Sequence, residues 1–208
     1  MTRDVAQLGQ VFTPPNVVAF MLDLCQNKGR TLEPSAGDGA FFSTLRQRGA
    51  DVVGIEIDRR VAPEGAKVRD FFDYPLTEQF DTIIGNPPYV RLQDVTVGTK
   101  NRLKSEFFDG RSNLFLFFIE KCIRHLKPGG ELVFIVPREF IKLTAARKLN
   151  AWLYQQGSIT HFYETGDVRV FDGATPNCAI FRFEKGRLDR RMADGRTFTE
   201  VHGQLMFL

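Results

Sequence analysis

The spacing of hydrophobic residues along this chain alternates between the period of a helix and the short, nearly continuous runs of buried strands. Helical spacing begins after Pro14-Pro15, where prolines suit the first turn of a helix. It predicts helices over residues 16–25, 40–49, 113–130 and 138–156. The apolar runs predict strands over residues 30–34, 51–58, 66–70, 80–85, 131–137, 159–165 and 178–185.

Strands that are nearly continuously apolar and alternate with helices are typical of a mostly parallel sheet covered on both faces. The sequence therefore predicts a doubly wound α/β domain. Such sheets bind ligands beyond the carboxyl ends of their strands. Four predicted strand ends carry polar or glycine-rich groups: residues 33–39, 56–58, 70–72 and 86–89.

Composition narrows the class of protein. The chain has 208 residues, 43% hydrophobic and 25% charged, which suits one globular domain. No apolar run reaches the roughly 18 residues of a membrane span, and the first residues lack a signal-peptide hydrophobic region. Cys25, Cys122 and Cys178 form no CxxC pair, so we expect neither a disulfide framework nor a metal site, and a cytoplasmic setting.

Charge is unevenly distributed. Residues 1–99 hold 10 basic and 13 acidic side chains, a net of −3, and residues 100–208 hold 18 basic and 12 acidic ones, a net of +6. This asymmetry is compatible with a polyanionic partner on one side of the molecule. On charge alone, a basic face that contacts only solvent fits equally well.

The first three strand ends together describe a nucleoside pocket. Gly37-Asp38-Gly39 lets the backbone approach a ligand, although such turns are often only tight turns. Glu56, about 20 residues later, is placed to accept hydrogen bonds from ribose hydroxyls. Asp70 suits an adenine amino group, unless it is only a turn residue. Because the third fingerprint glycine and a GK[ST] sequence are missing, the pocket lacks a phosphate clamp, which favours S-adenosylmethionine over NAD or ATP.

The fourth strand end, Asn86-Pro87-Pro88-Tyr89, offers a different chemistry. An aromatic amine is a poor nucleophile because its lone pair is delocalised into the ring. The side-chain oxygen of Asn86 and a rigidly held backbone oxygen of Pro87 would accept its two N–H groups and direct the lone pair at a methyl group. Tyr89 would stack on the base. In isolation, the same four residues would be a structural turn.

Taken together and in this order, the motifs resemble those of the catalytic domain of N6-adenine DNA methyltransferases of the γ (amino) class. The resemblance covers about residues 8 to 186. It is carried by "GQVFTPPNVVAFMLDL", "LEPSAGDGAF", "GIEIDRR", "RDFFDY", "FDTIIGNPPYVR" and "VFDGATPNCAIFRFEKG". It implies a Rossmann-like class I methyltransferase fold, S-adenosylmethionine as the cofactor, and methylation of adenine N6 in a restriction-modification context.

The resemblance also implies roles for single residues. Those implied for the cofactor are Thr13, Glu33, Ser35, Gly37, Glu56, Ile57, Asp70 and Phe71. Those implied for catalysis are Asn86, Pro87, Pro88 and Tyr89, with Tyr89 and Phe171 stacking on the target adenine. Asp38, inside the glycine turn, receives no role.

DNA is the implied partner, and the target base must leave the duplex at a cost of about a few kcal/mol. The polar stretch from residue 91 to 113 follows the catalytic motif directly. We expect it to face DNA, with its basic side chains on phosphates, although a plain solvated loop is the alternative. These side chains are Arg91, Lys100, Arg102, Lys104 and Arg111.

The end of the chain departs from the family pattern. Residues 1–186 are predicted to form the catalytic domain, and residues 187–208 are too few for the separate target-recognition domain that usually follows. Truncation explains this most simply, with these residues starting a missing domain. A partner subunit that supplies recognition, or recognition by loops alone, are the alternatives.

Three rival functions stay open. Protein-glutamine N5 methyltransferases use the same NPPY motif, but they normally carry a helical domain ahead of the glycine-rich motif, where this chain has "GQVFTPP". RNA adenine methyltransferases share the chemistry. A non-catalytic DNA-binding subunit could keep the fold, but Glu56, Asn86 and Tyr89 are all present.

Overall fold

The computed structural model describes residues 13–108, 112–165 and 177–208. The roles predicted for Arg111 and Phe171 lie outside these ranges. Among the described helices, none is long and apolar enough to cross a membrane.

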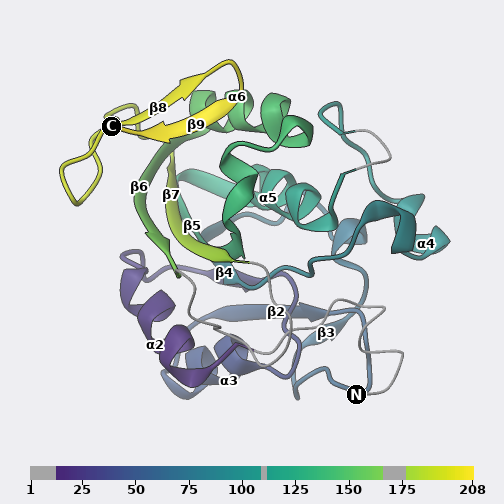
Figure 1. The fold of residues 1–208 in the computed structure, drawn as a ribbon. Helices are drawn as coiled ribbons and strands as arrows, with labels where there is room; N and C mark the ends of the chain where they lie inside the picture. The colour runs from purple at the N-terminus through teal and green to yellow at the C-terminus, as the bar shows by residue number, and fades with distance from the viewer. Residues whose placement is uncertain (1–12, 109–111, 166–176) are drawn as a thin grey trace.

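A seven-stranded sheet forms the centre of the described structure, in the order β3-β2-β1-β4-β5-β7-β6 (Figure 1). Its strands are β1 (Thr31–Glu33), β2 (Val52–Glu56), β3 (Lys67–Val68), β4 (Phe80–Gly85), β5 (Leu126–Pro137), β6 (Gly157–Glu164) and β7 (Cys178–Lys185). The first five pair in parallel, and β7 pairs antiparallel with both β5 and β6. The predicted doubly wound, mostly parallel sheet is confirmed.

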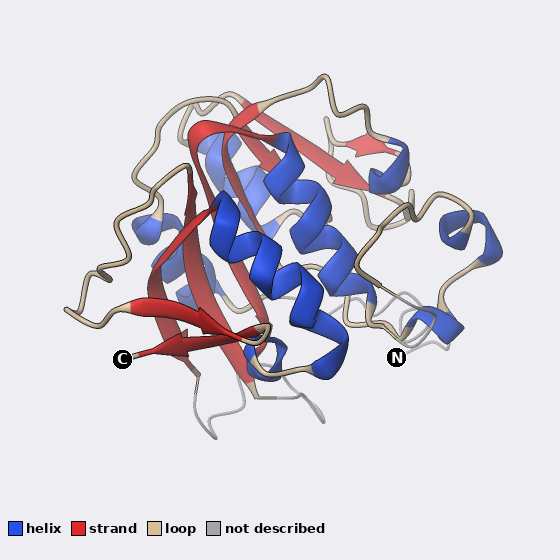
Figure 2. Cartoon of the chain, turned by 90° about the horizontal axis from the view of Figure 1, so that it is seen from above, coloured by secondary structure: helices blue, strands red, loops and turns tan. Residues whose placement is uncertain are grey.

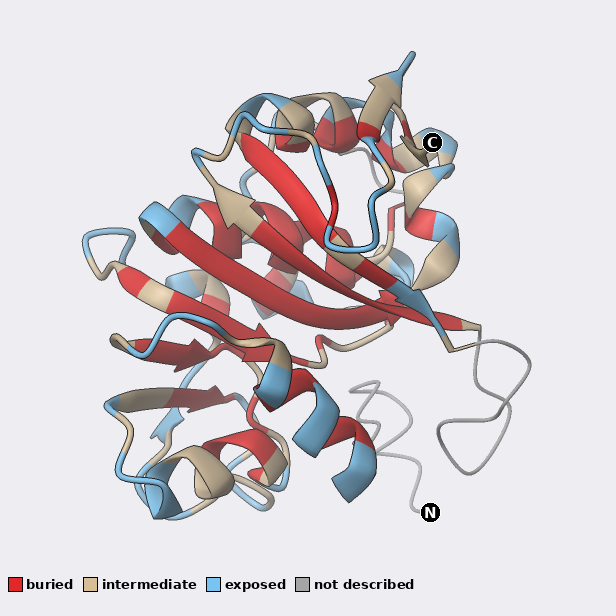
Figure 3. Cartoon of the chain, turned by 90° about the vertical axis from the view of Figure 1, so that its left-hand side faces the viewer, coloured by how far each residue is buried: buried red, intermediate tan, exposed pale blue. Residues whose placement is uncertain are grey.

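Helices cover both faces of this sheet (Figures 1 and 2). One face is packed by α2 (Pro15–Leu24) and α3 (Ala40–Gln47), and the other by α5 (Leu114–His125) and α6 (Arg147–Gln156). Successive side chains of β5 point to opposite faces of the sheet. Val133 and Ile135 pack in the core on the α2 side, and Leu132 and Phe134 pack in the core on the α5 side. The central strands β4 and β5 are therefore largely buried on both sides, and the edge strand β3 is exposed (Figure 3).

Two predicted helix boundaries were wrong. α5 begins after its cap Asn113 and ends at His125, because residues 126–130 already belong to β5. The helix predicted over residues 138–156 begins only at Arg147, after two 3-10 turns, η3 (Arg138–Ile141) and η4 (Thr144–Ala146). Leu143 between them is extended, and the Asn150 side chain donates to the carbonyls of Phe140 and Ile141.

The last residues form a hairpin that the sequence did not predict, β8 (Phe198–Val201) and β9 (Gln204–Phe207). It lies against α6 in Figure 1. Phe198 and Leu205 are fully buried in the same core as β5 and α5. The hairpin thus packs as part of the main unit, and the start of a recognition domain in this region stays a prediction.

Candidate active site

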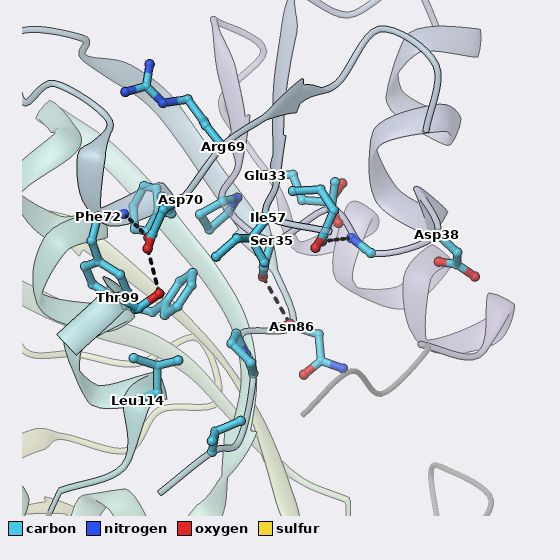
Figure 4. Close-up of a pocket in the computed structure, with 18 of the residues that line it drawn as sticks. Glu33, Ser35, Asp38, Ile57, Arg69, Asp70, Phe72, Asn86, Thr99 and Leu114 are labelled. Atoms are coloured by element: carbon cyan, nitrogen blue, oxygen red, sulfur yellow. Dashed lines mark hydrogen bonds between the residues drawn. The ribbon is translucent and has the colours of Figure 1, made fainter. Parts of the chain in front are cut away.

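A pocket opens at the carboxyl edge of the sheet, where β1, β2 and β4 end (Figure 4). The structure brings together at this pocket every described residue that was predicted for the cofactor, along with two of the catalytic motif. They are Thr13, Glu33, Ser35, Gly37, Glu56, Ile57, Asp70, Phe71, Asn86 and Pro88. Their placement agrees with the strand-end rule, and their roles stay predictions.

The glycine turn and the end of β2 are joined by a hydrogen bond. The N–H of Gly37 donates to Oε2 of Glu56 at 2.7 Å, and the N–H of Asp58 donates to Oε1 at 2.9 Å. Gly37 has a φ of +54°, a left-handed conformation that side chains with a Cβ rarely adopt. Glu56 is 4% exposed, so these two amides hold its carboxylate at the pocket wall.

Glu33, at the end of β1, is a buried carboxyl in the pocket wall. Burial raises the pKa of this carboxyl well above its ordinary value, and a hydrogen bond from the Phe42 backbone opposes the shift. The charges of Asp38 and Glu56 raise this pKa further. Among the described residues, Oε2 of Glu33 has no hydrogen-bond partner. A buried acceptor of this kind suits a cationic donor from a ligand.

The opposite end of the pocket is apolar, with one carboxylate. Ile57 is 46% exposed at its rim, and Phe71 is buried against Phe118 with ring centroids 5.1 Å apart. Asp70 accepts from the Phe72 N–H at 2.9 Å through Oδ1. A flat heterocycle with a hydrogen-bond donor at its edge matches this slot.

Sequence reasoning missed several residues of this slot, Phe118 and Thr99 among them. Phe118 was seen only as part of a buried helix, and nothing in its local spacing marks which apolar residue of α5 reaches the pocket. Thr99 was part of a stretch predicted to face DNA, yet it lines the pocket and donates to Oδ2 of Asp70 at 2.7 Å.

The catalytic motif follows β4 and is anchored at both ends. Ser35 Oγ donates to the backbone oxygen of Asn86, and Asn86 Nδ2 donates to Thr13 Oγ1, both at 3.3 Å. The Tyr89 hydroxyl donates to the Ile135 carbonyl of β5 at 2.8 Å. Burial raises the pKa of Tyr89 well above its ordinary value, so this hydroxyl stays protonated. Pro87 is buried, outside the pocket lining.

In its described residues, 91–108 and 112–113, the stretch after the motif packs against the rest of the chain and does not form a plain solvated loop. It contains η2 (Leu92–Asp94) and α4 (Val97–Lys100), and Phe108 packs on Phe117 with ring centroids 4.5 Å apart. Three of its predicted DNA contacts already have partners within the chain. Arg91 pairs with Asp94, Lys100 donates to the Gln93 carbonyl, and Arg102 pairs with Asp73. Lys104 is exposed. Their contact with DNA stays a prediction.

Comparison with known proteins agrees with this geometry. Residues 54–171 match the family model described as Eco57I restriction-modification methylase. The chain is 35% identical over 192 residues to the type II methyltransferase M.HincII of Haemophilus influenzae, which covers 86% of this chain and 38% of that protein. It is 36% identical over 222 residues to M.TthHB8I of Thermus thermophilus, which covers 96% of this chain and 51% of that protein. The chain therefore spans about half or less of these relatives.

Solved structures show the same fold at low identity. The M protein of the type I restriction enzyme EcoKI superposes with a TM-score of 0.67 at 15% identity, over 86% of this chain and 45% of that one. A class I S-adenosylmethionine-dependent methyltransferase from Listeria monocytogenes gives a TM-score of 0.65 at 20% identity, over 87% of this chain and 62% of that one. The fold of this chain is the class I methyltransferase fold.

Proposed function

Because this chain belongs to the Eco57I restriction-modification methylase family, we propose that it carries the catalytic site of a DNA methyltransferase that moves a methyl group from S-adenosylmethionine to adenine N6. The observation that supports this most directly is the position of Asn86. It lies at the rim of a pocket whose other walls suit the two ends of an adenosyl-methionine cofactor.

The residues present fit that cofactor. The buried, unpartnered oxygen of Glu33 suits the ammonium of the methionine end, and Glu56 suits the ribose hydroxyls. Ile57 and Phe71 provide apolar surface for the adenine, and Asp70 provides an acceptor for its amino group. When bound, the cofactor supplies a methyl group on a positively charged sulfur.

The catalytic motif orients the nucleophile. Thr13 and Ser35 hold Asn86 at the pocket wall, and Pro87-Pro88 fixes the backbone that follows. Acceptors from Asn86 and Pro87 would bind the two N–H groups of the target amine and direct its lone pair at the methyl group. A base in a duplex cannot reach this site, so the target adenine is flipped out, with the Tyr89 ring stacking on it.

Recognition of a DNA sequence requires more than this site. Basic side chains of the stretch that follows the motif, Lys104 among them, would contact phosphates and fix the register of the duplex. We infer that a further domain or a partner subunit reads the bases.

The test of the function is methyl transfer to three acceptors in parallel. The chain is incubated with labelled-methyl S-adenosylmethionine and unmethylated genomic DNA, total RNA or a protein extract, with Asn86→Ala as the control. We expect label in N6-methyladenine of DNA that disappears in the variant. Label in RNA or in glutamine would overturn the DNA assignment. Cofactor binding without transfer to any acceptor would favour the non-catalytic DNA-binding subunit.

Glu33→Gln is expected to raise the thermal stability of the protein without cofactor and to lower its affinity for S-adenosylmethionine. The pKa of this carboxyl is raised in the folded state. Its contribution to the free energy of unfolding is therefore fully present below the unfolded pKa near 4.5, and it is lost as pH rises through the folded pKa. The neutral variant should therefore have a higher Tm without cofactor at pH 8, by about 2–4 °C or more, and the gain should vanish below pH 4.5. Affinity for S-adenosylmethionine should fall by about 10–100-fold, because a charge-assisted hydrogen bond is lost.

Differential scanning fluorimetry across pH and calorimetric titration of the cofactor measure the two effects. Glu106→Gln, at an exposed carboxyl, is the matched control. A Glu33→Gln variant that is less stable at pH 8, or that binds the cofactor as well as the wild type, would contradict this role.

A further inference from the structure

The segment from Val95 to Thr99 turns back over the slot proposed for adenine. Val95, Thr96 and Thr99 line the same pocket as Asp70 and Phe71, although they follow the catalytic motif in sequence. Figure 4 shows the Thr99 side chain directed at Asp70. Thr99 is 7% exposed, so its hydroxyl is shielded from bulk water.

Two hydroxyls and one carboxylate form a directed chain of hydrogen bonds. The Thr96 hydroxyl donates to Thr99 Oγ1 at 3.3 Å, and Thr99 Oγ1 donates to Asp70 Oδ2 at 2.7 Å. The Thr99 N–H also donates to Thr96 Oγ1 at 3.3 Å, which fixes the turn of α4 that carries both residues. Since the single hydroxyl proton of Thr99 is used toward Asp70, the direction of this chain is determined.

This arrangement fixes the Asp70 carboxylate from both sides. The Phe72 N–H occupies one oxygen, and Thr99 occupies part of the other. A carboxylate oxygen can accept two hydrogen bonds, so Oδ2 keeps capacity for one donor from a ligand. Asp70 is thus held by two donors, and an ionised carboxylate accepts hydrogen bonds and donates none.

Arg102, three residues after this segment, holds the other end of the 3-10 turn η1 (Phe71–Asp73). Arg102, just after α4, pairs with Asp73 and also donates to the Gly98 carbonyl. The turn that carries Phe71 is therefore fixed at Asp70 by Thr99 and at Asp73 by Arg102. The wall of the slot thus depends on residues that are about 30 positions away in sequence.

We propose that Thr99 is a positioning residue that holds Asp70 as an acceptor and so makes the pocket select purine nucleosides with an amino group at position 6. The inference rests on the proposed function, because it assumes an adenosyl cofactor. A 6-oxo purine places a carbonyl oxygen at this position, and two acceptors facing each other in a buried site are unfavourable. Thr99 acts through Asp70 and need not touch the ligand.

The test compares S-adenosylhomocysteine with S-inosylhomocysteine, which differ at position 6, amino against oxo, and at N1, which carries a hydrogen only in the inosyl base. Calorimetric Kd values are measured for wild type, Thr99→Val and Thr99→Ser. We expect Thr99→Val to lose about 3–10-fold in affinity for the adenosyl ligand and little for the inosyl ligand, so that the selectivity ratio falls. Thr99→Ser should restore the ratio because it keeps the hydroxyl.

Controls separate this role from a general effect on the fold. Thr199→Val, in the distant hairpin, should change neither Kd. In an Asp70→Asn background, Thr99→Val should have no further effect on selectivity, because the carboxylate through which it acts has been removed.

The outcomes that overturn the proposal are distinct from those that overturn the function. If wild type prefers the adenosyl ligand and Thr99→Val keeps the same ratio, or weakens both ligands equally, Thr99 does not position Asp70. If the wild type binds neither ligand, or binds both equally, the adenosyl pocket itself is wrong and the inference falls with it.

Discussion

Asn86→Ala is expected to lower kcat for methyl transfer to DNA by about a thousand-fold, the upper range for removing one preorganised hydrogen-bonding group from an active site. The side chain is held by Thr13, and its backbone oxygen by Ser35, so it is oriented before any substrate binds. Alanine removes the acceptor for the target amine without changing the strand that precedes it. Binding of S-adenosylhomocysteine should weaken by less than about ten-fold, because one neutral hydrogen bond to Thr13 is lost.

Single-turnover methylation under saturating cofactor isolates this effect from cofactor binding. Asn86→Asp should lose less activity than Asn86→Ala, because a carboxylate also accepts from an amine. Tyr89→Phe is the matched control within the motif. It keeps the ring that would stack on the base and removes the hydroxyl that donates to Ile135. An Asn86→Ala enzyme within ten-fold of the wild-type rate would show that the amine is oriented by other groups.

The arrangement of the site was predictable because parallel strands deliver their carboxyl ends to one edge. Glu56 and Asn86 end or follow strands with a clear apolar run, and Glu33 ends a short strand before Pro34, so their convergence follows from the order of the elements. The hydrogen bond from Gly37 to Glu56 is the direct result of neighbouring strands β1 and β2 pairing in parallel.

Other features depend on contacts between distant residues and left little local signal. Thr99 reaches Asp70 only because the stretch after the motif folds back, with Phe108 packed on α5. The β8–β9 hairpin turns at His202-Gly203, both with positive φ, a geometry that sequence patterns associate more strongly with Asn-Gly. The first 3-10 turn before α6, η3, is held by the side chain of Asn150, several residues later.

A second large effect concerns stability and a residue far from the pocket. Glu131 of β5 is fully buried and pairs with Arg182 of β7, Nε to Oε2 at 2.7 Å. It also accepts from the Thr82 hydroxyl at 3.0 Å. The backbone N–H groups of Gln26 and Asn27, just after α2, donate to it at 3.2 and 2.8 Å. One carboxylate therefore joins three strands to the end of α2.

Glu131→Ala is expected to lower the free energy of unfolding by about 3–5 kcal/mol, because the 4% exposed Arg182 loses its closer carboxylate and keeps only the longer pair with Glu184 at 3.4 Å. Chemical denaturation measures the change. Glu131→Leu combined with Arg182→Met should recover much of the loss, since a buried pair can be replaced by apolar residues of similar volume. Asp94→Ala, which breaks the exposed pair with Arg91, should change stability by less than about 1 kcal/mol.

The same substitution should also reach the active site through α2. This helix packs Val18 and Met21 against the sheet, its end is tied to Glu131, and Thr13 just before it contacts Asn86. Once α2 loses its anchor, the position of Thr13 is less well fixed. Both Glu131→Ala and the double variant lack this carboxylate, so we expect methyl transfer by each to fall more steeply with temperature than that of the wild type. Equal stability and equal activity in the two would show that the amides of Gln26 and Asn27, and not the buried charge, account for the role of Glu131.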